Sequence, residues 1–364
     1  MKLLILQDYL RAGGTERQSV ALSRFFAAQG HATTLLTFRP GGDLAPPGGD
    51  VFHLSLQRYD SRWNGWAPGL VRTLRKTQPD IVLCMGYFAN VYAGWIQSRL
   101  PNSRVVGTLR TLHKMPRWLV WSWNALPLVI SNTQAGREIL TDGFKFAPRR
   151  VIVIPNALTH ALDFQNAKGH RTRQRERQGA RNHTLVLLNV GMFRKEKGQA
   201  ELIRMVADWK PECDWQLWLL GDGPLLDKCR RLARKLPQVR FLGYEADATF
   251  FYASADAAVL TSKMESLSNF LCEAQAAGLP VVAYDVGGAK ECFEPGVSGY
   301  AIPYGREDAF QDALSTLAQD TEKRAAMGAA ARLWAQRFDP HRQSQAYLDC
   351  FRSLIFQGEL PVRG

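Results

Sequence analysis

The feature that most constrains the fold is a repeated alternation of short apolar runs with amphipathic segments. The chain begins with an apolar run at residues 3–6, continues with an amphipathic segment at about 15–29 that Gly30 ends, and returns to an apolar run at 33–38. A strand, a helix and a strand joined by short loops form a right-handed parallel unit. Further strands are predicted in this half at residues 81–85, 105–109, 128–131 and 151–154.

The same alternation restarts in the second half of the chain. Its predicted strands are residues 184–190, 215–220, 239–242, 257–260, 280–284 and 300–302. Strands that are almost continuously apolar indicate parallel sheets covered by helices on both faces. The predicted fold class is α/β, with two doubly wound, Rossmann-like domains that face each other across a central cleft.

Length and composition agree with two domains, because 364 residues with 46% hydrophobic content can form two ordinary α/β cores. The first domain is predicted at residues 1–165 and the second at 184–340. Residues 166–183 are polar and basic, which is typical of a linker. A final helix at 341–364 has no strand after it, and we expect it to pack back on the first domain.

The positive charge is concentrated in the first half of the chain. Residues 1–181 contain 25 Lys and Arg against 10 Asp and Glu, whereas the whole chain has a net charge of +13. Such an asymmetry favours an anionic partner, either an acidic membrane leaflet, a phosphorylated glycolipid or a nucleic acid. The alternative is that surface arginines simply keep the protein in solution.

Localisation can be predicted from what the sequence lacks. The first apolar run ends at Asp8 and does not resemble a signal peptide, and no apolar run approaches the roughly 20 residues of a membrane-spanning helix. The six cysteines form no C-x-x-C pair and favour reduced thiols. We therefore expect a soluble, cytoplasmic protein, and the basic first half suggests peripheral contact with the inner face of the membrane.

The strongest functional signal is the segment E-S-L-S-N-F-L-C-E from Glu265 to Glu273. If Ser266 or Ser268 caps a helix that starts here, the first N–H groups of the helix form a site for a phosphate. Glu273 lies two turns into that helix, where it can accept hydrogen bonds from hydroxyl groups, while Glu265 projects from the preceding loop. A nucleotide sugar would satisfy both carboxylates.

In each predicted domain, a glycine-containing loop follows the first strand. Gly13-Gly14-Thr15-Glu16-Arg17 opens a helix in the first domain, but it lacks the third glycine of the dinucleotide fingerprint. In the second domain, Gly191 begins a loop that holds Arg194, Lys195 and Lys197 at a sheet edge where open α/β sheets bind ligands. These cations favour a diphosphate, whose developing charge they could neutralise without a metal.

Further turns fall at predicted strand ends. They contain Asn156, Gly221 and the pair Gly243-Tyr244, each of which could also be an ordinary turn.

The segment P-R-W-L-V-W-S-W at 116–123 interleaves three tryptophans with a cation. It suits either a membrane or lipid-linked acceptor, or a helix whose tryptophans fill the core.

Taken together, these residues resemble the retaining glycosyltransferases of family 4, which share the GT-B architecture of two Rossmann-like domains. The similarity runs from Gly13 to about Tyr304 and is strongest at 191–299. The resemblance implies that Glu265 approaches the donor sugar, that Glu273 holds the ribose hydroxyls and that Lys197 binds the diphosphate. The E-x-L-S-N variant resembles enzymes that build bacterial polysaccharide and lipopolysaccharide.

The implied site contains three groups of residues. The catalytic group is Arg194, Lys197, Glu265 and Arg110. The donor-binding group is Gly13, Gly14, Asn156, Gly191, Gly221, Gly243, Tyr244, Ser266, Leu267, Ser268, Asn269 and Glu273. Thr15 and His113 are expected on the acceptor side. No metal site and no cofactor are expected.

Two positions depart from the pattern of the family. Met192 stands where an arginine is usual, so that Arg194 would have to supply the charge, and Arg110 stands where many members have a histidine. Either Arg110 contacts the donor or His113 takes over part of that task.

The predicted activity is metal-independent, retaining transfer of a hexose-type sugar from a nucleoside diphosphate sugar, with UDP favoured over GDP. The acceptor is a glycan or glycolipid hydroxyl in cell-envelope polysaccharide synthesis. The alternatives are a sugar-nucleotide epimerase of the same fold and a basic nucleic-acid-binding protein. The second is disfavoured because no nucleic-acid-binding module is present.

Overall fold

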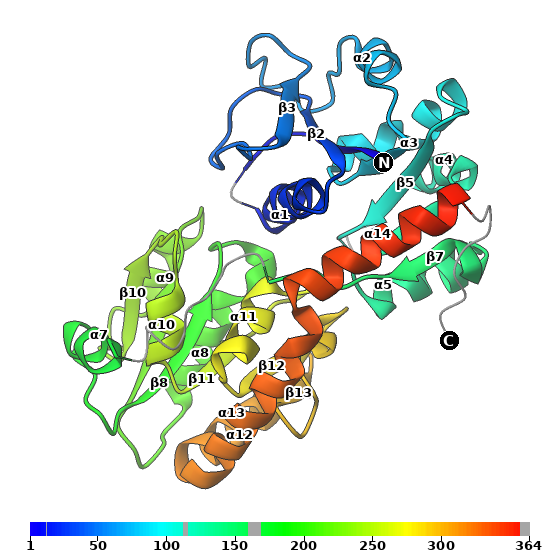
Figure 1. Cartoon of the computed structure of the whole chain (residues 1–364). Coiled ribbons are helices and arrows are strands. Elements are labelled where there is room, and N and C mark those ends of the chain that lie inside the picture. The colour runs from blue at the N-terminus through cyan, green and yellow to red at the C-terminus, as the bar shows by residue number, and fades with distance from the viewer. Residues whose placement is uncertain (12, 112–115, 159–168, 357–364) are drawn as a thin grey trace. The chain divides into compact units, whose positions relative to one another are not determined.

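The computed structural model describes the chain except for residues 12, 112–115, 159–168 and 357–364. It divides into two compact units (Figure 1). The first unit comprises Met1–Thr159 and Phe338–Gly364, and the second comprises His160–Arg337.

The first unit is built on a parallel sheet of seven strands in the order β3-β2-β1-β4-β5-β6-β7. The strands are β1 (Lys2–Gln7), β2 (Ala32–Thr37), β3 (Val51–Ser55), β4 (Ile81–Cys84), β5 (Arg104–Leu109), β6 (Leu128–Ser131) and β7 (Val151–Val153). Alternate side chains of β1 enter different cores, since Leu4 and Leu6 lie in one apolar cluster and Leu3 and Ile5 in another. The sheet is therefore buried on both faces, as its apolar strands predicted.

Helices cover both faces of this sheet. They are α1 (Gly14–Ala28), α2 (Leu70–Thr77), α3 (Tyr87–Arg99), α4 (Arg117–Ser122), α5 (Gln134–Glu138) and α14 (Pro340–Phe356), with short turns η1 (Trp123–Ala125), η2 (Ile139–Gly143) and η3 (Pro148–Arg150). The C-terminal α14 belongs to this unit and packs on α1, where the rings of Phe26 and Phe351 are 5.8 Å apart.

The second unit has a parallel sheet of six strands in the order β10-β9-β8-β11-β12-β13. The strands are β8 (Leu185–Val190), β9 (Trp215–Leu220), β10 (Val239–Gly243), β11 (Ala257–Leu260), β12 (Val281–Asp285) and β13 (Gly299–Pro303). Its helices are α7 (Arg171–Arg177), α8 (Gln199–Asp208), α9 (Leu226–Leu232), α10 (Thr249–Ser254), α11 (Asn269–Ala277), α12 (Glu307–Gln319) and α13 (Thr321–Ala335), with turns η4 (Lys195–Lys197), η5 (Ala289–Cys292) and η6 (Gln336–Phe338). The prediction of two doubly wound parallel-sheet domains is confirmed.

Two local predictions differ from the structure. Strand β3 was not predicted, because it is an edge strand in which only Val51 is fully buried, so that its apolar signal is weak. The predicted linker at 166–183 contains helix α7 within the second unit. Its polar composition was misleading because one of its arginines is a core residue.

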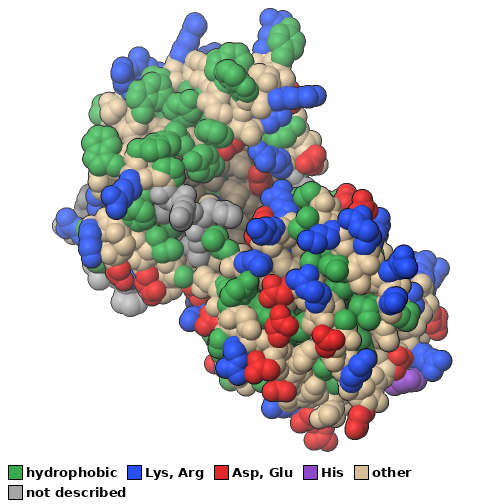
Figure 2. Space-filling view, turned by 180° about the vertical axis from the view of Figure 1, so that it is seen from behind, with side chains coloured by type: hydrophobic (Ala, Val, Ile, Leu, Met, Phe, Trp, Pro, Cys, Tyr) green, Lys and Arg blue, Asp and Glu red, His purple; other side chains and the backbone are tan. Residues whose placement is uncertain are grey.

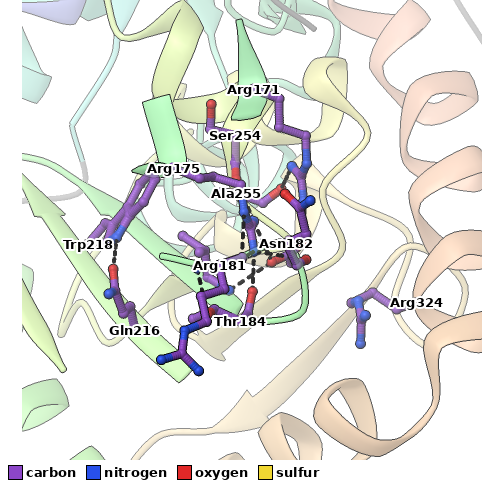
Figure 3. A network of polar contacts seen from close by, with 12 residues as sticks. Arg171, Arg175, Arg181, Asn182, Thr184, Gln216, Trp218, Ser254, Ala255 and Arg324 are labelled. Atoms are coloured by element: carbon purple, nitrogen blue, oxygen red, sulfur yellow. Dashed lines mark hydrogen bonds and ion pairs between the residues drawn. The ribbon is translucent and has the colours of Figure 1, made fainter. Parts of the chain in front are cut away.

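That core residue is Arg175, whose side chain is only 1% exposed. Its guanidinium bonds to Asp256 at 3.0 Å and donates hydrogen bonds to the carbonyl oxygens of Ser254, Arg181 and Thr184 (Figure 3). A buried arginine is stable when a carboxylate and several carbonyls take up its five donors. This arrangement fixes α7 to the strand ends beside it.

Two further findings concern the described residues as a whole. All six cysteines are free thiols. Within the described part of the chain, no helix combines the length and apolar character that crossing a bilayer requires.

Candidate functional site

The second sheet brings most of the predicted donor residues to one edge. Its strands are parallel, so the loops that follow them share the carboxyl edge. Arg194 and Lys197 follow β8, and Glu265 follows β11. The other predicted residues at this edge are Gly191, Gly221, Gly243, Tyr244, Ser266, Leu267, Ser268 and Asn269. The strand order reverses between β8 and β11, and such a switch point is where open α/β sheets bind ligands.

Lys197 and Glu265 meet across this switch point. The Lys197 Nζ lies 2.7 Å from Glu265 Oε1, and the Ser262 hydroxyl donates a hydrogen bond to the same oxygen at 2.7 Å. Glu265 is 7% exposed, whereas the Lys197 side chain is 31% exposed. Ser262 and Lys197 therefore hold the buried Glu265 carboxylate in place, while the Lys197 side chain remains partly exposed to solvent. Ser262 was missed, although its position three residues before Glu265 was a usable signal.

Two glycines allow the loops of this edge to approach one another. At Gly198, φ is +73° and a Cβ atom would lie 2.0 Å from the carbonyl oxygen of Thr261. At Gly221, φ is +140° and a Cβ atom would lie 2.1 Å from the carbonyl oxygen of Gly191. Only glycine fits either position. The loop after β8 is thereby packed against the loops after β11 and β9.

The start of α11 differs in one detail from the prediction. Ser268 occupies the N-cap position, but its side chain makes no capping hydrogen bond. The helix nevertheless begins at Asn269, so its N-terminus and positive dipole end lie at the carboxyl edge of the sheet. An anion at this point would be stabilised by the backbone, while the serine side chain contributes no cap.

Glu273 lies half-buried on α11 and is oriented by a tyrosine. Its Oε2 accepts a hydrogen bond of 2.6 Å from the hydroxyl of Tyr252, which is buried on α10. The Tyr252 ring in turn stacks on Phe270, with centroids 6.1 Å apart. Tyr252 was missed, because a tyrosine in the apolar segment F-F-Y carries no sequence signal that distinguishes it from a core residue.

The cation expected to replace the usual arginine is at the surface. The Arg194 side chain is half exposed and lies 3.9 Å from Glu196. Met192, at the family's arginine position, is also exposed. An exposed ion pair of this length stabilises little and leaves Arg194 able to reorient. Tyr244 is exposed at the same edge.

The first unit has a cavity of about 440 Å³ at its own switch point, between β1 and β4. Of the predicted residues, Thr15 and Arg110 line it. The Arg110 guanidinium donates hydrogen bonds to Asn156 Oδ1 and, at 3.1 Å, to the hydroxyl of Tyr347 on α14. Arg110 and Asn156, 46 residues apart, are thus brought together. His113 lies outside the described residues.

Two acidic residues in this cavity were not predicted as site residues. Asp8 follows β1, and its carboxylate accepts hydrogen bonds from the backbone N–H groups of Phe88 at 2.9 Å and Ala89 at 2.8 Å, at the start of α3. Burial raises the pKa of Asp8 to about 6, against the lowering effect of those two hydrogen bonds and of Arg11. Burial also raises the pKa of Glu16.

Glu16 also lies against one of the two glycines at the start of α1. A Cβ atom on Gly13 would lie 2.3 Å from the Glu16 Oε2 atom. The side chain of Glu16 therefore folds back into the space that Gly13 leaves open. The Glu16 carboxylate is the end of a flexible side chain and can move, so this contact alone does not require a glycine at position 13.

The raised pKa of Asp8 predicts a pH-dependent stability. The folded state holds this proton more tightly than the unfolded state, so the contribution of Asp8 is complete below the ordinary aspartate pKa of 3.8 and is lost as pH rises through about 6. The difference corresponds to about 3 kcal/mol. Between these pH values, the free energy of unfolding in urea should fall more steeply with pH in the wild type than in Asp8→Asn, which keeps only the contribution of groups such as Glu16. An identical slope in both proteins would contradict the assignment, and Asp50→Asn, an exposed carboxylate, is the control.

Comparisons with known families match both halves of the chain. Residues 12–161 match the model described as Glycosyltransferase Family 4, and residues 170–334 match the model described as Glycosyl transferases group 1. Among curated proteins, the chain is 26% identical over 302 residues to the lipopolysaccharide core biosynthesis glycosyltransferase LpsD of Rhizobium meliloti, covering 82% of this chain and 81% of that protein.

A second relative and two solved structures extend this similarity. The chain is 31% identical to the D-inositol 3-phosphate glycosyltransferase of Corynebacterium kroppenstedtii over 65% of this chain and 55% of that protein. The structure of Anabaena Alr3699/HepE in complex with UDP superposes with a TM-score of 0.80 at 22% identity, covering 97% of this chain and 100% of that one. WaaG, a glycosyltransferase involved in lipopolysaccharide biosynthesis, superposes with a TM-score of 0.75 at 18% identity, covering 96% and 99%.

The two Rossmann-like units, and their superposition on these structures, define the GT-B class of fold. Both family models are models of glycosyltransferases, and together they match most of the chain. The protein is an enzyme that belongs to glycosyltransferase family 4.

Proposed function

We propose that the protein transfers a hexose-type sugar from UDP-sugar to a hydroxyl group of a glycan or glycolipid in cell-envelope polysaccharide synthesis. The observation that carries this proposal is the pair of Lys197 and Glu265 at the switch point of the second sheet, beside the N-terminus of α11. The choice of UDP is supported by the UDP complex of Alr3699/HepE, and the acceptor class by LpsD.

In this proposal the second unit binds the donor. Lys197 and the N-terminus of α11 hold the diphosphate, with Arg194 as a second cation, and Glu273 accepts hydrogen bonds from the ribose hydroxyls. The bond between the anomeric carbon and the diphosphate oxygen breaks, and a bond to the acceptor oxygen forms on the same face. The acceptor proton passes to the departing diphosphate oxygen. Cations fixed beside that oxygen lower the barrier by stabilising its developing charge.

The proposal needs no metal ion and no cofactor. Lys197, Arg194 and the backbone N–H groups of α11 would neutralise the diphosphate. Among the described residues, no group of three or more His, Cys, Asp or Glu side chains is placed to hold a metal. Assays in excess EDTA test this part directly, and full loss of activity that Mg²⁺ restores would contradict it.

The first unit binds the acceptor in this proposal. Its cavity at the switch point is lined by polar and charged groups, among them Asp8, Glu16 and Arg110, and by the apolar side chains of Leu109 and Trp123. Such a combination suits a sugar ring, whose hydroxyls bind carboxylates and whose C–H face packs on apolar side chains. We place the enzyme in the cytoplasm, at the inner face of the membrane where lipid-linked acceptors are available.

The reaction is tested by incubating the full chain with UDP-sugars, with and without acceptor glycans. Anomeric analysis of the product by NMR reports retention or inversion. Acceptor-dependent release of UDP supports a transferase. Complete turnover without any acceptor would favour the sugar-nucleotide epimerase instead.

Glu273→Ala is expected to raise the dissociation constant for UDP by about 10- to 100-fold, since hydrogen bonds to a charged acceptor contribute about 1.5–3 kcal/mol. Isothermal titration calorimetry with UDP measures the change. Tyr252→Phe removes only the group that orients the carboxylate and should have a smaller effect in the same direction. Glu322→Ala, an exposed carboxylate on α13, is the control. Unchanged UDP affinity in Glu273→Ala would remove the assigned role.

A further inference from the structure

The first unit exposes many aromatic side chains. On the face shown in Figure 2, hydrophobic side chains are spread over this unit and Lys and Arg side chains surround them. Among the described residues, every exposed tryptophan lies in the first unit, and Trp63 and Trp121 are 73% and 76% exposed. The exposed tryptophans are Trp63, Trp66, Trp95, Trp118 and Trp121. Water-exposed tryptophan is costly, so such a cluster indicates a surface with a partner.

Helix α3 forms the centre of this cluster. Tyr87 and Trp95 are eight residues apart and both exposed, so they lie on one stripe of the helix. On one side of the stripe, the Tyr92 hydroxyl donates a 2.7 Å hydrogen bond to the carbonyl oxygen of Gly65. This bond holds the loop that carries Trp63 and Trp66 beside the helix.

Helix α4 lies on the other side of the stripe. Gly94 of α3 packs so closely on α4 that a Cβ atom would lie 2.2 Å from the carbonyl oxygen of Ser122. The buried Trp123 donates a 3.0 Å hydrogen bond to the carbonyl oxygen of Asn90. The three segments thus pack together, and we name their exposed aromatic side chains the aromatic surface: Trp63, Trp66, Tyr87, Trp95, Trp118 and Trp121.

The surroundings of the aromatic surface are basic. The sequence contains no Asp or Glu between Asp80 and Glu138, an interval that includes all of α3 and α4. Asp60, in the loop, is engaged by Arg39 at 2.6 Å. The first unit as a whole contains 22 Lys and Arg against 11 Asp and Glu. Arginines at the edge of the surface include Arg58, Arg62, Arg99 and Arg117, of which Arg99 lies over the Trp95 ring.

The aromatic surface adjoins the cavity of the first unit. Tyr87 belongs to both, and Leu119 and Trp123, from α4 and the turn after it, line the cavity wall. The same two helices therefore present aromatic side chains to the outside and enclose the space in which the acceptor is proposed to bind.

We propose that the aromatic surface binds an anionic lipid bilayer and that a lipid-linked acceptor passes from the bilayer over α3 and α4 into the cavity. Tryptophan and tyrosine partition to the interface between lipid headgroups and acyl chains, and nearby arginines bind anionic headgroups. The absence of acidic residues from α3 and α4 removes the repulsion that such headgroups would meet. The acceptor route rests on the proposed function, whereas bilayer binding does not.

The experiment on bilayer binding is co-sedimentation of the full chain with vesicles of phosphatidylcholine alone or of equal parts phosphatidylcholine and phosphatidylglycerol. We expect binding to the anionic vesicles that weakens when ionic strength rises from about 0.1 M to about 1 M, as the Debye length falls from about 10 Å to about 3 Å. Brominated lipids should quench tryptophan fluorescence, because the rings enter the interface. Equal binding to both vesicles, or binding without quenching, would overturn the proposal.

Variants show which surface of the protein contacts the vesicles. W63A/W121A should bind anionic vesicles about tenfold more weakly through lost aromatic area, and R62Q/R117Q about thirtyfold more weakly through lost charge. L333A removes an equally exposed apolar side chain from the second unit, and R230Q/R306Q removes two exposed arginines there. Both controls should bind as the wild type does. Weakening by the controls as large as by the test variants would show that the aromatic surface is not the contact.

Two other occupants of the aromatic surface would appear in distinct measurements. Self-association that W63A/W121A abolishes, seen by analytical ultracentrifugation, would identify a second copy of the chain. Oligosaccharide binding that W63A/W121A abolishes while vesicle binding is unchanged would identify a glycan platform. Either result would overturn the bilayer proposal.

The acceptor route is tested with one acceptor in two forms. With a lipid-linked acceptor in vesicles, W63A/W121A should raise KM about tenfold and leave kcat unchanged; with a short soluble acceptor, both constants should match the wild type. An equal loss with both forms would overturn the route. If no glycosyl transfer occurs with either form, the proposed function fails, and the vesicle measurements still decide bilayer binding.

Discussion

Lys197→Ala is expected to lower kcat by about 10²- to 10³-fold, the cost of removing one group that stabilises developing charge in an active site. The Lys197 ammonium is fixed 2.7 Å from Glu265 and reaches solvent at the carboxyl edge of the second sheet, where the proposed diphosphate departs. Its charge should matter most when the bond to the anomeric carbon breaks, so the affinity for UDP-sugar should change less than the turnover. Steady-state kinetics with saturating acceptor separate the two constants.

The control for this variant lies in the same turn. Lys195→Ala removes the same charge from an exposed position of η4 and should retain most of the activity. Thermal unfolding of both variants shows whether the fold is intact, because Lys197→Ala also leaves the buried Glu265 without its cation. A folded Lys197→Ala protein with wild-type kcat would exclude the assigned role.

Arg175→Ala is expected to destabilise the protein by about 3–5 kcal/mol, the cost of leaving one partner of a buried ion pair uncompensated. The variant would remove a cation from Asp256 and one hydrogen-bond donor from each of the carbonyl oxygens of Ser254 and Arg181. Arg171 also bonds to Asp256 and limits the loss of charge compensation, but it cannot replace the hydrogen bonds to Arg181. Equilibrium denaturation in urea measures the difference in the free energy of unfolding.

Arg173→Ala is the matched control for the buried arginine. It lies on the same helix α7 but is exposed, so its removal should change the free energy of unfolding by less than about 0.5 kcal/mol. If the two variants were equally stable, α7 would not be anchored by Arg175, and residues 171–177 would behave as the linker that their composition suggested.

Much of the second-unit site could be predicted because its residues are close in sequence to predicted strand ends. Once β8 and β11 were identified from their apolar runs, parallel pairing required their loops to share an edge, which placed Lys197 and Glu265 near each other. The ion pair itself was not predicted. The hydrogen bond from Tyr252 to Glu273 was not predicted either, because a hydrogen bond between two separate helices follows no periodic pattern in the sequence.

The first-unit cavity was harder to predict. Asp8 was noted only as the end of an apolar run, because its partners, the N–H groups of Phe88 and Ala89, lie 80 and 81 residues away. The tryptophans at 116–123 could be core or surface. The structure separates them, since Trp123 is 1% exposed while Trp118 and Trp121 point to solvent. Three residues of one short segment thus have two different roles.

The sequence by itself determined the alternation of strands and helices, the two parallel sheets and the family, because apolar periodicity and glycine turns are local properties of the chain. The tertiary structure alone decided which polar groups are buried and which aromatic groups are exposed. Arg175 is a core residue, Asp8 holds its proton up to a pKa of about 6, and α3 joins its aromatic neighbours into one surface. Burial depends on which distant segments pack together, and that information is not contained in any local stretch of residues.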